Sequence, residues 1–190
     1  GNTLSGTGIS NYFARRPLAG KPHPTVALMN QMKYDSAGYT SIDFSTTPQF
    51  RDARKRESNF TWVSSNAYAG SNLYAADHRM LVYDVPNSAH VLKIAIISLP
   101  DPEKISSIPK ENIQGIEFYD PAEEVIRLGD VLKVIDRADF LILTTDMQWE
   151  LDPVKRKDSL LYKILERSRI DIAVVGSDEV ISGEQLLFED

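Results

Sequence analysis

The sequence predicts a single domain of the α+β class, with helices mainly in its N-terminal half and a run of strands after them. Three observations support this prediction. Val91–Leu99 is dense in β-branched and aliphatic residues, which favours a buried strand over a helix. Lys155–Arg169 places leucine and isoleucine among charged residues at the spacing of an amphipathic helix. Between these two segments the predicted strands follow one another without alternating helices, which favours α+β over a parallel βαβ fold.

In the first half, residues 1–11 have the polar composition of a flexible lead-in. The following elements are expected after it: a strand at Tyr12–Arg16, a helix at Val26–Lys33, a strand at Tyr39–Thr46, a helix at Gln49–Ser58 and a strand at Thr61–Val63. The helix at Gln49–Ser58 is supported by Pro48, since proline is favoured in the first turn of a helix.

In the second half, strands are expected at Met80–Val85, Val91–Leu99, Ile113–Tyr119, Glu124–Arg127, Val131–Ile135, Phe140–Thr145 and Ile172–Val175. Gly129 and Asp130 would form the turn between two of these strands. Residues 153–190 form a C-terminal extension of the same domain (residues 1–190), and their role is open.

The composition excludes several classes of protein. The net charge is −6, whereas a nucleic-acid-binding protein usually carries a basic excess, so we expect no nucleic-acid partner. The run Arg51–Arg56 is the densest basic stretch and is read as a solvated helix face. The absence of cysteine excludes disulfides and thiolate chemistry. No apolar run reaches 18 residues, so no membrane span is expected.

Two short stretches suggest a function. The first is Phe44-Ser45-Thr46-Thr47, at the end of a predicted strand, and the second is Glu124-Val125-Ile126. With Val91–Leu99 between them, this order resembles the arginine-serine-glutamate group of ADP-ribosyltransferases, which includes the cholera-toxin-like enzymes. The resemblance covers roughly residues 12 to 143.

The resemblance implies an ADP-ribosyltransferase-like split β-sandwich and a secreted bacterial toxin or effector. Such a protein acts in the cytosol of a host or target cell. It modifies a target protein by NAD-dependent mono-ADP-ribosylation, with release of nicotinamide. NAD would be the co-substrate, and no metal would take part.

The resemblance also assigns roles to particular residues. Glu124 would stabilise the oxocarbenium-like transition state, and Ser45 would order the site. The remaining residues that would bind NAD are Arg15, Arg16, Thr46, Thr47 and Phe50. Ala122 stands where the family often has Glu or Gln, which implies a different acceptor residue on the target protein.

Simpler explanations of the same residues remain open. Ser45, Thr46 and Thr47 could be a strand end and the N-cap of the helix after Pro48. Glu123 and Glu124 could be a solvated pair. Two other functions are open: a non-catalytic protein-interaction domain, and a hydrolase with a carboxylate pair such as Asp120 with Glu123. The three histidines lie far apart in the sequence, and none has the spacing of a metal site.

Overall fold

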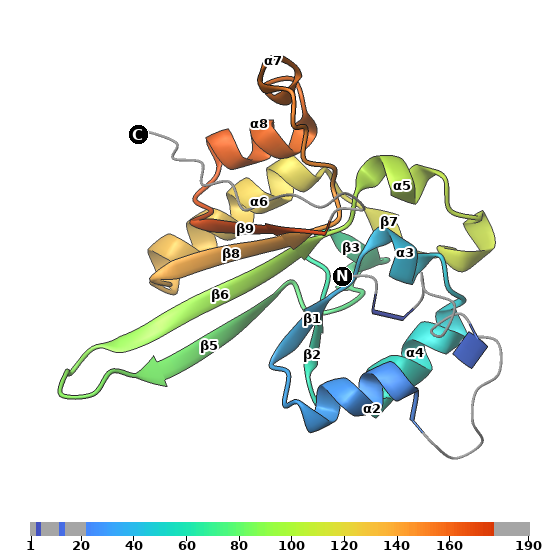
Figure 1. Cartoon of the computed structure of the whole chain (residues 1–190), viewed down its shortest axis with the longest axis horizontal. Coiled ribbons are helices and arrows are strands. Elements are labelled where there is room, and N and C mark those ends of the chain that lie inside the picture. The colour runs from blue at the N-terminus through green and yellow to red at the C-terminus, as the bar shows by residue number, and fades with distance from the viewer. Residues whose placement is uncertain (1–2, 5–11, 14–21, 177–190) are drawn as a thin grey trace.

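The structure, a computed structural model, describes residues 3–4, 12–13 and 22–176 and has the mixed helix and strand content that the sequence predicts (Figure 1). The helices are α2 (Pro24–Gln31), α3 (Ser41–Phe44), α4 (Pro48–Glu57), α5 (Pro102–Ser106), the 3-10 helix η1 (Lys110–Asn112), α6 (Pro121–Asp130), the π-helix η2 (Val131–Ile135), α7 (Pro153–Arg156) and α8 (Leu160–Arg167). The strands are β1 (Ser36–Gly38), β2 (Thr61–Val63), β3 (Ala67–Ala69), β4 (Asn72–Leu73), β5 (His78–Asp84), β6 (Val91–Leu99), β7 (Glu117–Phe118), β8 (Phe140–Thr145) and β9 (Ile172–Val175).

The largest sheet has four strands in the order β5-β6-β8-β9. Strands β5 and β6 form an antiparallel hairpin, whereas β6, β8 and β9 run parallel to one another. Parallel neighbours need crossover connections, which α6 and α8 provide. This half of the chain is therefore built from βαβ units, contrary to the expectation of strands without alternating helices.

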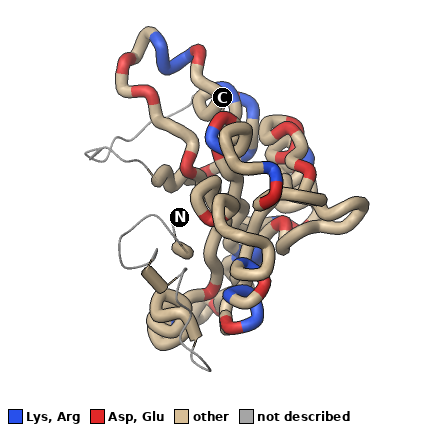
Figure 2. The backbone as a smooth tube through the Cα atoms, turned by 90° about the vertical axis from the view of Figure 1, so that its right-hand side faces the viewer, with Lys and Arg blue, Asp and Glu red and all other residues tan. Residues whose placement is uncertain are grey.

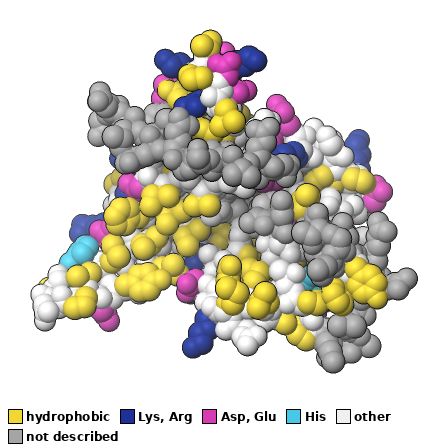
Figure 3. Space-filling view, in the orientation of Figure 1, with side chains coloured by type: hydrophobic (Ala, Val, Ile, Leu, Met, Phe, Trp, Pro, Cys, Tyr) yellow, Lys and Arg dark blue, Asp and Glu magenta, His cyan; other side chains and the backbone are white. Residues whose placement is uncertain are grey.

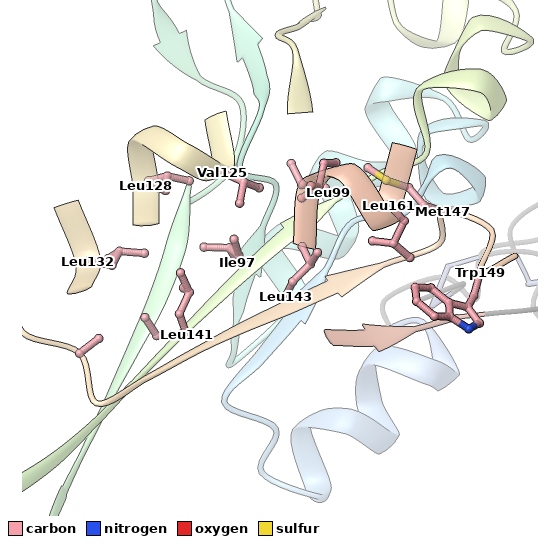
Figure 4. Packing of buried hydrophobic residues seen from close by; sticks show 13 residues of the cluster. Ile97, Leu99, Val125, Leu128, Leu132, Leu141, Leu143, Met147, Trp149 and Leu161 are labelled. Carbon is pink, nitrogen blue, oxygen red and sulfur yellow. The ribbon is translucent and has the colours of Figure 1, made fainter. Parts of the chain in front are cut away.

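Helices α6, η2 and α8 cover one face of this sheet and enclose an aliphatic core (Figures 1 and 4). The strands contribute Ala95, Ile97, Leu99, Leu141 and Leu143, and the helices contribute Val125, Leu128, Leu132, Leu161 and Ile164. Alternate residues of each strand point into this core, because successive side chains of a strand lie on opposite faces.

A second core lies around the parallel pair β1-β2 and the antiparallel sheet β4-β3-β7. It is rich in aromatic rings: Tyr39 stacks on Trp62 with 4.5 Å between ring centroids, and Phe44 meets Phe118 edge-on at 4.9 Å. Helices α2 and α4 pack against this core through Val26, Met29 and Phe50. Strand β1 of the two-stranded sheet contacts β6 of the four-stranded sheet. The two sheets, and with them the two cores, therefore lie side by side.

The predicted strands at Glu124–Arg127 and Val131–Ile135 are wrong, because both stretches are helical. The Asp120 side chain caps α6 by accepting from the backbone N–H groups of Ala122 and Glu123, and Pro121 occupies its first turn. Val125, Leu128 and Leu132 then recur at helical spacing and are fully or almost fully buried. The β-branched residues of these stretches favour strands. The helix forms instead because it buries Val125, Leu128 and Leu132 on one face.

Two further strand predictions fail in part. Residues 39–46 are not a strand: β1 ends at Gly38, and α3 follows, with Thr40 and Asp43 forming its capping box. Of the strand expected at 113–119, only Glu117–Phe118 pairs with a neighbour. Most of the lead-in expected at 1–11 lies outside the described residues, but Leu4 is described and is completely buried rather than loose. Of the strand expected at 12–16, Tyr12 and Phe13 are described and are helical, which contradicts the prediction, and residues 14–16 lie outside the described residues.

The described helices are all too short or too polar to cross a membrane. Figure 2 shows acidic and basic residues mixed along the side of the molecule that faces the viewer. The basic run on α4 is not simply a solvated face, because Arg51 and Arg54 are buried.

Candidate functional site

One hollow, which we call the crevice, lies beyond the carboxyl-terminal ends of β1, β6, β8 and β9. It has a volume of about 310 Å³ and is lined by Ser41, Ile42, Ser45, Lys104, Ser107, Ile108, Asp146 and Gly176. Each lining segment follows directly on a strand or on the turn after it: α3 after β1, α5 after β6, Asp146 after β8 and Gly176 after β9. Ligands of open parallel sheets usually bind outside the carboxyl ends of the strands, and the crevice has this position.

Asp146 joins the loops that form the crevice. Its Oδ2 accepts a hydrogen bond from the backbone N–H of Ser41 at 3.1 Å, and its Oδ1 accepts from the backbone N–H of Asp101 at 2.9 Å. Its backbone oxygen accepts from Lys104 Nζ at 2.6 Å. Both carboxylate oxygens of this buried residue are therefore engaged by backbone donors, which fixes the turns after β1, β6 and β8 relative to one another.

Ser41 and Asp101 add a second link between the same turns. Ser41 Oγ donates to the backbone oxygen of Asp101 at 3.2 Å and accepts from its N–H at 3.1 Å. The Asp101 side chain caps α5 by accepting from the N–H of Glu103. Burial raises the pKa of Asp101 above its usual value, although the Glu103 N–H and the nearby Lys104 oppose this effect.

The exposed polar side chains of the crevice are those of Lys104, Ser45 and Ser107. The Lys104 side chain is 47% exposed, and its Nζ lies 3.9 Å from Asp101 Oδ2. The hydroxyls of Ser45 and Ser107 donate to the backbone oxygens of Ile42 and Glu103. An ammonium group with neighbouring hydroxyls is an arrangement that binds phosphate or carboxylate oxygens.

Ser45 is the predicted catalytic residue that does line the crevice. It ends α3, and its Oγ donates to the backbone oxygen of Ile42 at 2.6 Å. Thr46 Oγ1 donates to the backbone oxygen of Asp43, and Thr47 Oγ1 accepts from the N–H of Phe50. The alternative explanation, that this stretch caps the helix after Pro48, is thus confirmed for Thr47.

Glu124 lies elsewhere, on the buried side of α6, and is not among the residues that line the crevice. Its Oε2 forms an ion pair with Arg127 at 2.7 Å and accepts from the Tyr68 hydroxyl at 3.4 Å. The structure therefore does not bring Glu124 and Ser45 into one site. Glu123 is exposed on the same helix, so the simpler explanation of a solvated pair is confirmed for Glu123 and is wrong for the buried Glu124.

The residues predicted to bind NAD are also separated. Phe50 packs against the Arg54 guanidinium, 4.7 Å from its ring centroid, and against the His23 ring at 5.7 Å. These contacts belong to the region between α2 and α4 and not to the crevice. Arg15 and Arg16 lie outside the described residues.

Sequence reasoning missed the residues that shape the crevice, above all Lys104, Asp101 and Asp146. A signal was present, because Asp101 and Asp146 each come directly after a correctly predicted strand or one residue beyond it. What could not be predicted was that these strands are parallel neighbours, so that both turns meet at one edge of the sheet. In the described residues, no group of three or more His, Asp or Glu side chains could hold a metal ion.

Comparisons with known proteins find similarity to nucleotidases and to a calcineurin-like phosphoesterase. No protein-family model matches it. It is 28% identical over 122 residues to a 5′-nucleotidase of Vibrio cholerae, an alignment that covers 63% of this chain and 21% of that protein. The chain thus spans about a fifth of this curated relative.

Solved structures agree with this relation at the level of the fold. The calcineurin-like phosphoesterase YfkN from Bacillus subtilis superposes with a TM-score of 0.73 at 18% identity, covering 92% of this chain and 55% of YfkN. A putative 5′-nucleotidase from Staphylococcus aureus gives 0.68 at 17% identity, covering 92% and 34%. The NAD nucleotidase NadN of Haemophilus influenzae gives 0.60 at 18% identity, covering 84% and 26%.

These findings overturn the predicted resemblance to cholera-toxin-like ADP-ribosyltransferases. The fold is of the calcineurin-like phosphoesterase type and not the split β-sandwich of that family. The predictions of a transferase, of a toxin or effector and of action in a host cytosol are withdrawn, since the relatives are nucleotidases and phosphoesterases. The alternative of a non-catalytic interaction domain is not favoured by these relatives either.

The cofactor prediction is corrected for the same reason. NAD as co-substrate without a metal belonged to the transferase hypothesis, whereas phosphatases commonly use divalent metal ions. The described residues do not fit such a metal centre, because Asp146, the carboxylate that lines the crevice, already accepts two backbone N–H bonds and no cluster of metal ligands surrounds it.

Proposed function

We propose that this chain is the phosphoesterase-type domain of a 5′-nucleotidase-like hydrolase, and that the crevice receives the phosphate group of its substrate. The observation that supports this proposal most directly is the position of the crevice. It lies outside the carboxyl ends of parallel strands, in a fold shared with phosphoesterases, and the exposed ammonium group of Lys104 lines it.

The side chains of the crevice suit a phosphate monoester. Lys104 would supply positive charge to the phosphate oxygens. The hydroxyls of Ser45 and Ser107 would supply neutral hydrogen bonds by turning away from the backbone oxygens of Ile42 and Glu103, to which they donate without a ligand. Ile42 and Ile108 form an apolar border beside these groups. Such a site binds and orients a phosphate group, which is the part of the reaction that these residues can perform.

The proposal also assigns the remaining chemistry to other parts of the protein. Hydrolysis of a phosphate monoester commonly relies on metal ions that activate water and stabilise charge. Because the described residues hold no suitable cluster, the metal ligands of the proposed hydrolase would come from outside them. The short alignment on the Vibrio protein, 21% of its length, is consistent with a larger enzyme.

Binding of inorganic phosphate, followed by amide chemical shifts, tests the proposal without requiring activity. We expect shifts that concentrate at the amides of the crevice when phosphate is added to the chain. The substitution Lys104→Met keeps the aliphatic stem and removes the charge, so phosphate binding should weaken by about tenfold. Release of phosphate from 5′-AMP by the complete gene product, with and without added divalent metals, tests the hydrolase itself.

Lys110→Met is the matched control, since Lys110 is exposed on η1 and does not line the crevice. It should bind phosphate as the parent does. If Lys104→Met and Lys110→Met weaken binding equally, the effect is one of overall charge, and the crevice is not the phosphate site.

A further inference from the structure

Hydrophobic side chains that are not part of the two cores gather in two different ways. Over β5, β6, β8 and β9 they form an open surface, which Figure 3 shows. Where the end of β7 meets the starts of α5 and α6, they line a second hollow with a volume of about 450 Å³, which we call the proline cavity. Its lining includes Pro100, Pro102, Pro121, Phe118, Tyr119 and Asn66. Pockets that bind small molecules commonly have such a size and a mostly apolar lining.

Helix α5 separates the proline cavity from the crevice. Pro102, Ile105 and Ser106 of α5 line the proline cavity. Lys104 of the same helix and Ser107 directly after it line the crevice. Among the described residues, none lines both hollows. The proline cavity is therefore a site of its own and not an extension of the crevice.

The proline cavity is poorly suited to an anion. Its described lining contains no Lys, Arg or His. Pro102 and Pro121 begin α5 and α6, and proline has no backbone N–H. The next N–H groups along both helices already donate to the caps Asp101 and Asp120. A phosphate group would therefore find no cationic side chain and no free donor at these helix starts, in contrast to the crevice with its lysine.

The proline cavity does carry acceptors that lack a donor. Asn66 is 2% exposed, and its Nδ2 donates to the backbone oxygen of Tyr119 at 2.9 Å. Its Oδ1 is buried and accepts no hydrogen bond from the described residues. In the exposed Asp120, both cap bonds go to Oδ1, which leaves Oδ2 for a ligand. A buried acceptor without a donor is unfavourable, so the cavity favours a ligand that brings N–H groups.

Two aromatic rings of the cavity are held in place by rings outside it. Tyr119 stacks on Tyr68 with 4.3 Å between the ring centroids and 18° between the ring planes. Phe118 meets Phe44 edge-on at 4.9 Å. Neither Tyr68 nor Phe44 lines the cavity. Aromatic walls that are already ordered suit a flat ring, because binding then costs little side-chain entropy.

We propose that the proline cavity binds a flat heteroaromatic ring that carries an amino group, such as the base of adenosine. The ring packs against the prolines and against Phe118 and Tyr119, and the amino group donates to Asn66 Oδ1 and Asp120 Oδ2. This binding goes beyond the proposed function, because the ligand needs no phosphate group and occupies a different hollow from the crevice.

Titration with adenosine, followed by amide chemical shifts, tests the proposal. Purine riboside, the same nucleoside without the amino group, is the matched ligand. Adenosine should shift the amides of Asn66, Ser106 and Tyr119, and it should bind about tenfold more tightly than purine riboside, which cannot donate to the two acceptors. Inorganic phosphate should leave these three amides unchanged. The comparison uses the parent chain, so it does not depend on the folding of a variant.

Ser106 and Ser107 provide a matched pair of variants. Both are exposed, and both hydroxyls donate to the backbone oxygen of Glu103. Ser106→Tyr fills the proline cavity, so it should weaken adenosine binding by about tenfold or more and leave phosphate binding unchanged. Ser107→Tyr places the same side chain at the crevice, so it should weaken phosphate binding and leave adenosine binding unchanged.

Three results would overturn the proposal. The first is equal binding of adenosine and purine riboside, which would mean that the amino group meets no acceptor. The second is equal loss of adenosine binding in the two tyrosine variants, and the third is a set of adenosine shifts that is confined to the crevice. Loss of phosphate binding alone, with adenosine binding intact, would count against the proposed function and not against this inference, so the two failures can be distinguished.

Discussion

The two hydrophobic cores of the molecule are built in different ways. The core beneath α6 and α8 is aliphatic, made mostly of leucine, isoleucine and alanine from regular strands and helices. The core around β1 and β2 is aromatic and is crossed by buried polar groups, among them Asp43 and Arg51. The aliphatic core depends on apolar side chains that recur at the spacing of a strand or a helix. The aromatic core depends also on hydrogen bonds between segments without regular secondary structure.

The buried polar groups of the aromatic core form hydrogen bonds that hold distant segments of the chain together. The buried Asp43 carboxylate accepts from the N–H groups of Leu4 and Thr40 and from the Thr40 hydroxyl. Burial raises its pKa, and these three donors oppose that rise. Segments distant in the sequence can thus be held in place with little regular secondary structure.

The largest expected effect is a cavity in the aliphatic core. Leu143→Ala removes a completely buried side chain and should lower the free energy of unfolding by about 2–5 kcal/mol, as measured by urea denaturation. Ile142→Ala, one residue earlier in the same strand, is the control, because Ile142 lies on the other face of the sheet and is only half-buried. Equal losses for the two variants would show that burial on the helix-covered face adds no stability, and the aliphatic core would not depend on it.

A smaller but still large effect is expected in the aromatic core. The Arg51 guanidinium is buried and donates to the backbone oxygens of Phe44, Thr46 and Asn112 and to the Tyr74 hydroxyl. Arg51→Met leaves these acceptors without their donor and should cost about 2 kcal/mol in urea unfolding. Arg51→Lys should restore little of this, since lysine cannot present the planar fork of donors.

Arg56→Met serves as the control on the same helix, because Arg56 is exposed. Its effect should stay within about 0.5 kcal/mol. If Arg51→Met were as well tolerated as Arg56→Met, the aromatic core would hold together by ring packing alone, and the difference between the two cores would disappear.

The same contrast explains how much could be predicted from the sequence. The strands at 61–63, 91–99, 140–145 and 172–175 and the helix that became α4 were confirmed, because their composition and periodicity record local burial. The helix α6 was missed, although Asp120-Pro121 signals a helix start and recurs as Asp101-Pro102 and Asp152-Pro153 at α5 and α7. At all three places the Asp-Pro pair is a stronger indication of a helix than the β-branched residues after it are of a strand.

The candidate site was less accessible to sequence reasoning than the fold. Ser45 was chosen from a motif and does line the crevice, but Glu124, chosen from the same motif, lies on another helix face. The crevice forms because Asp146 reaches the turns that begin at Ser41 and Asp101, 105 and 45 residues away in the sequence. No local pattern records a contact at such separation, which depends on parallel strand order.

The smallest expected effect on stability is that of Asp77→Asn. Asp77 and His78 form an ion pair at 2.8 Å at the start of β5. The neighbouring Ser65, which also bonds Ser98 on β6, donates to the Asp77 backbone oxygen. The hydrogen bond to Asp77 raises the pKa of His78 above 6.5, helped by Asp136 and opposed by burial. The bond to His78 lowers the pKa of Asp77 below 3.8, with a minor contribution from Arg127.

These shifts define the pH range in which the pair stabilises the fold. A histidine whose pKa is raised on folding contributes stability that is complete below pH 6.5 and is lost as the pH rises through its folded pKa. An aspartate whose pKa is lowered contributes stability that is present above pH 3.8 and is lost as the pH falls through its folded pKa. The parent should therefore exceed Asp77→Asn in stability most clearly between these two values.

Titration of the His78 ring by NMR checks the cause directly. Asp77→Asn should move the pKa of His78 down toward 6.5. An unchanged pKa of His78 in the variant would mean that Asp77 does not hold the ring. The link between β5 and the aromatic core would then depend on the hydrogen bonds of Ser65 alone.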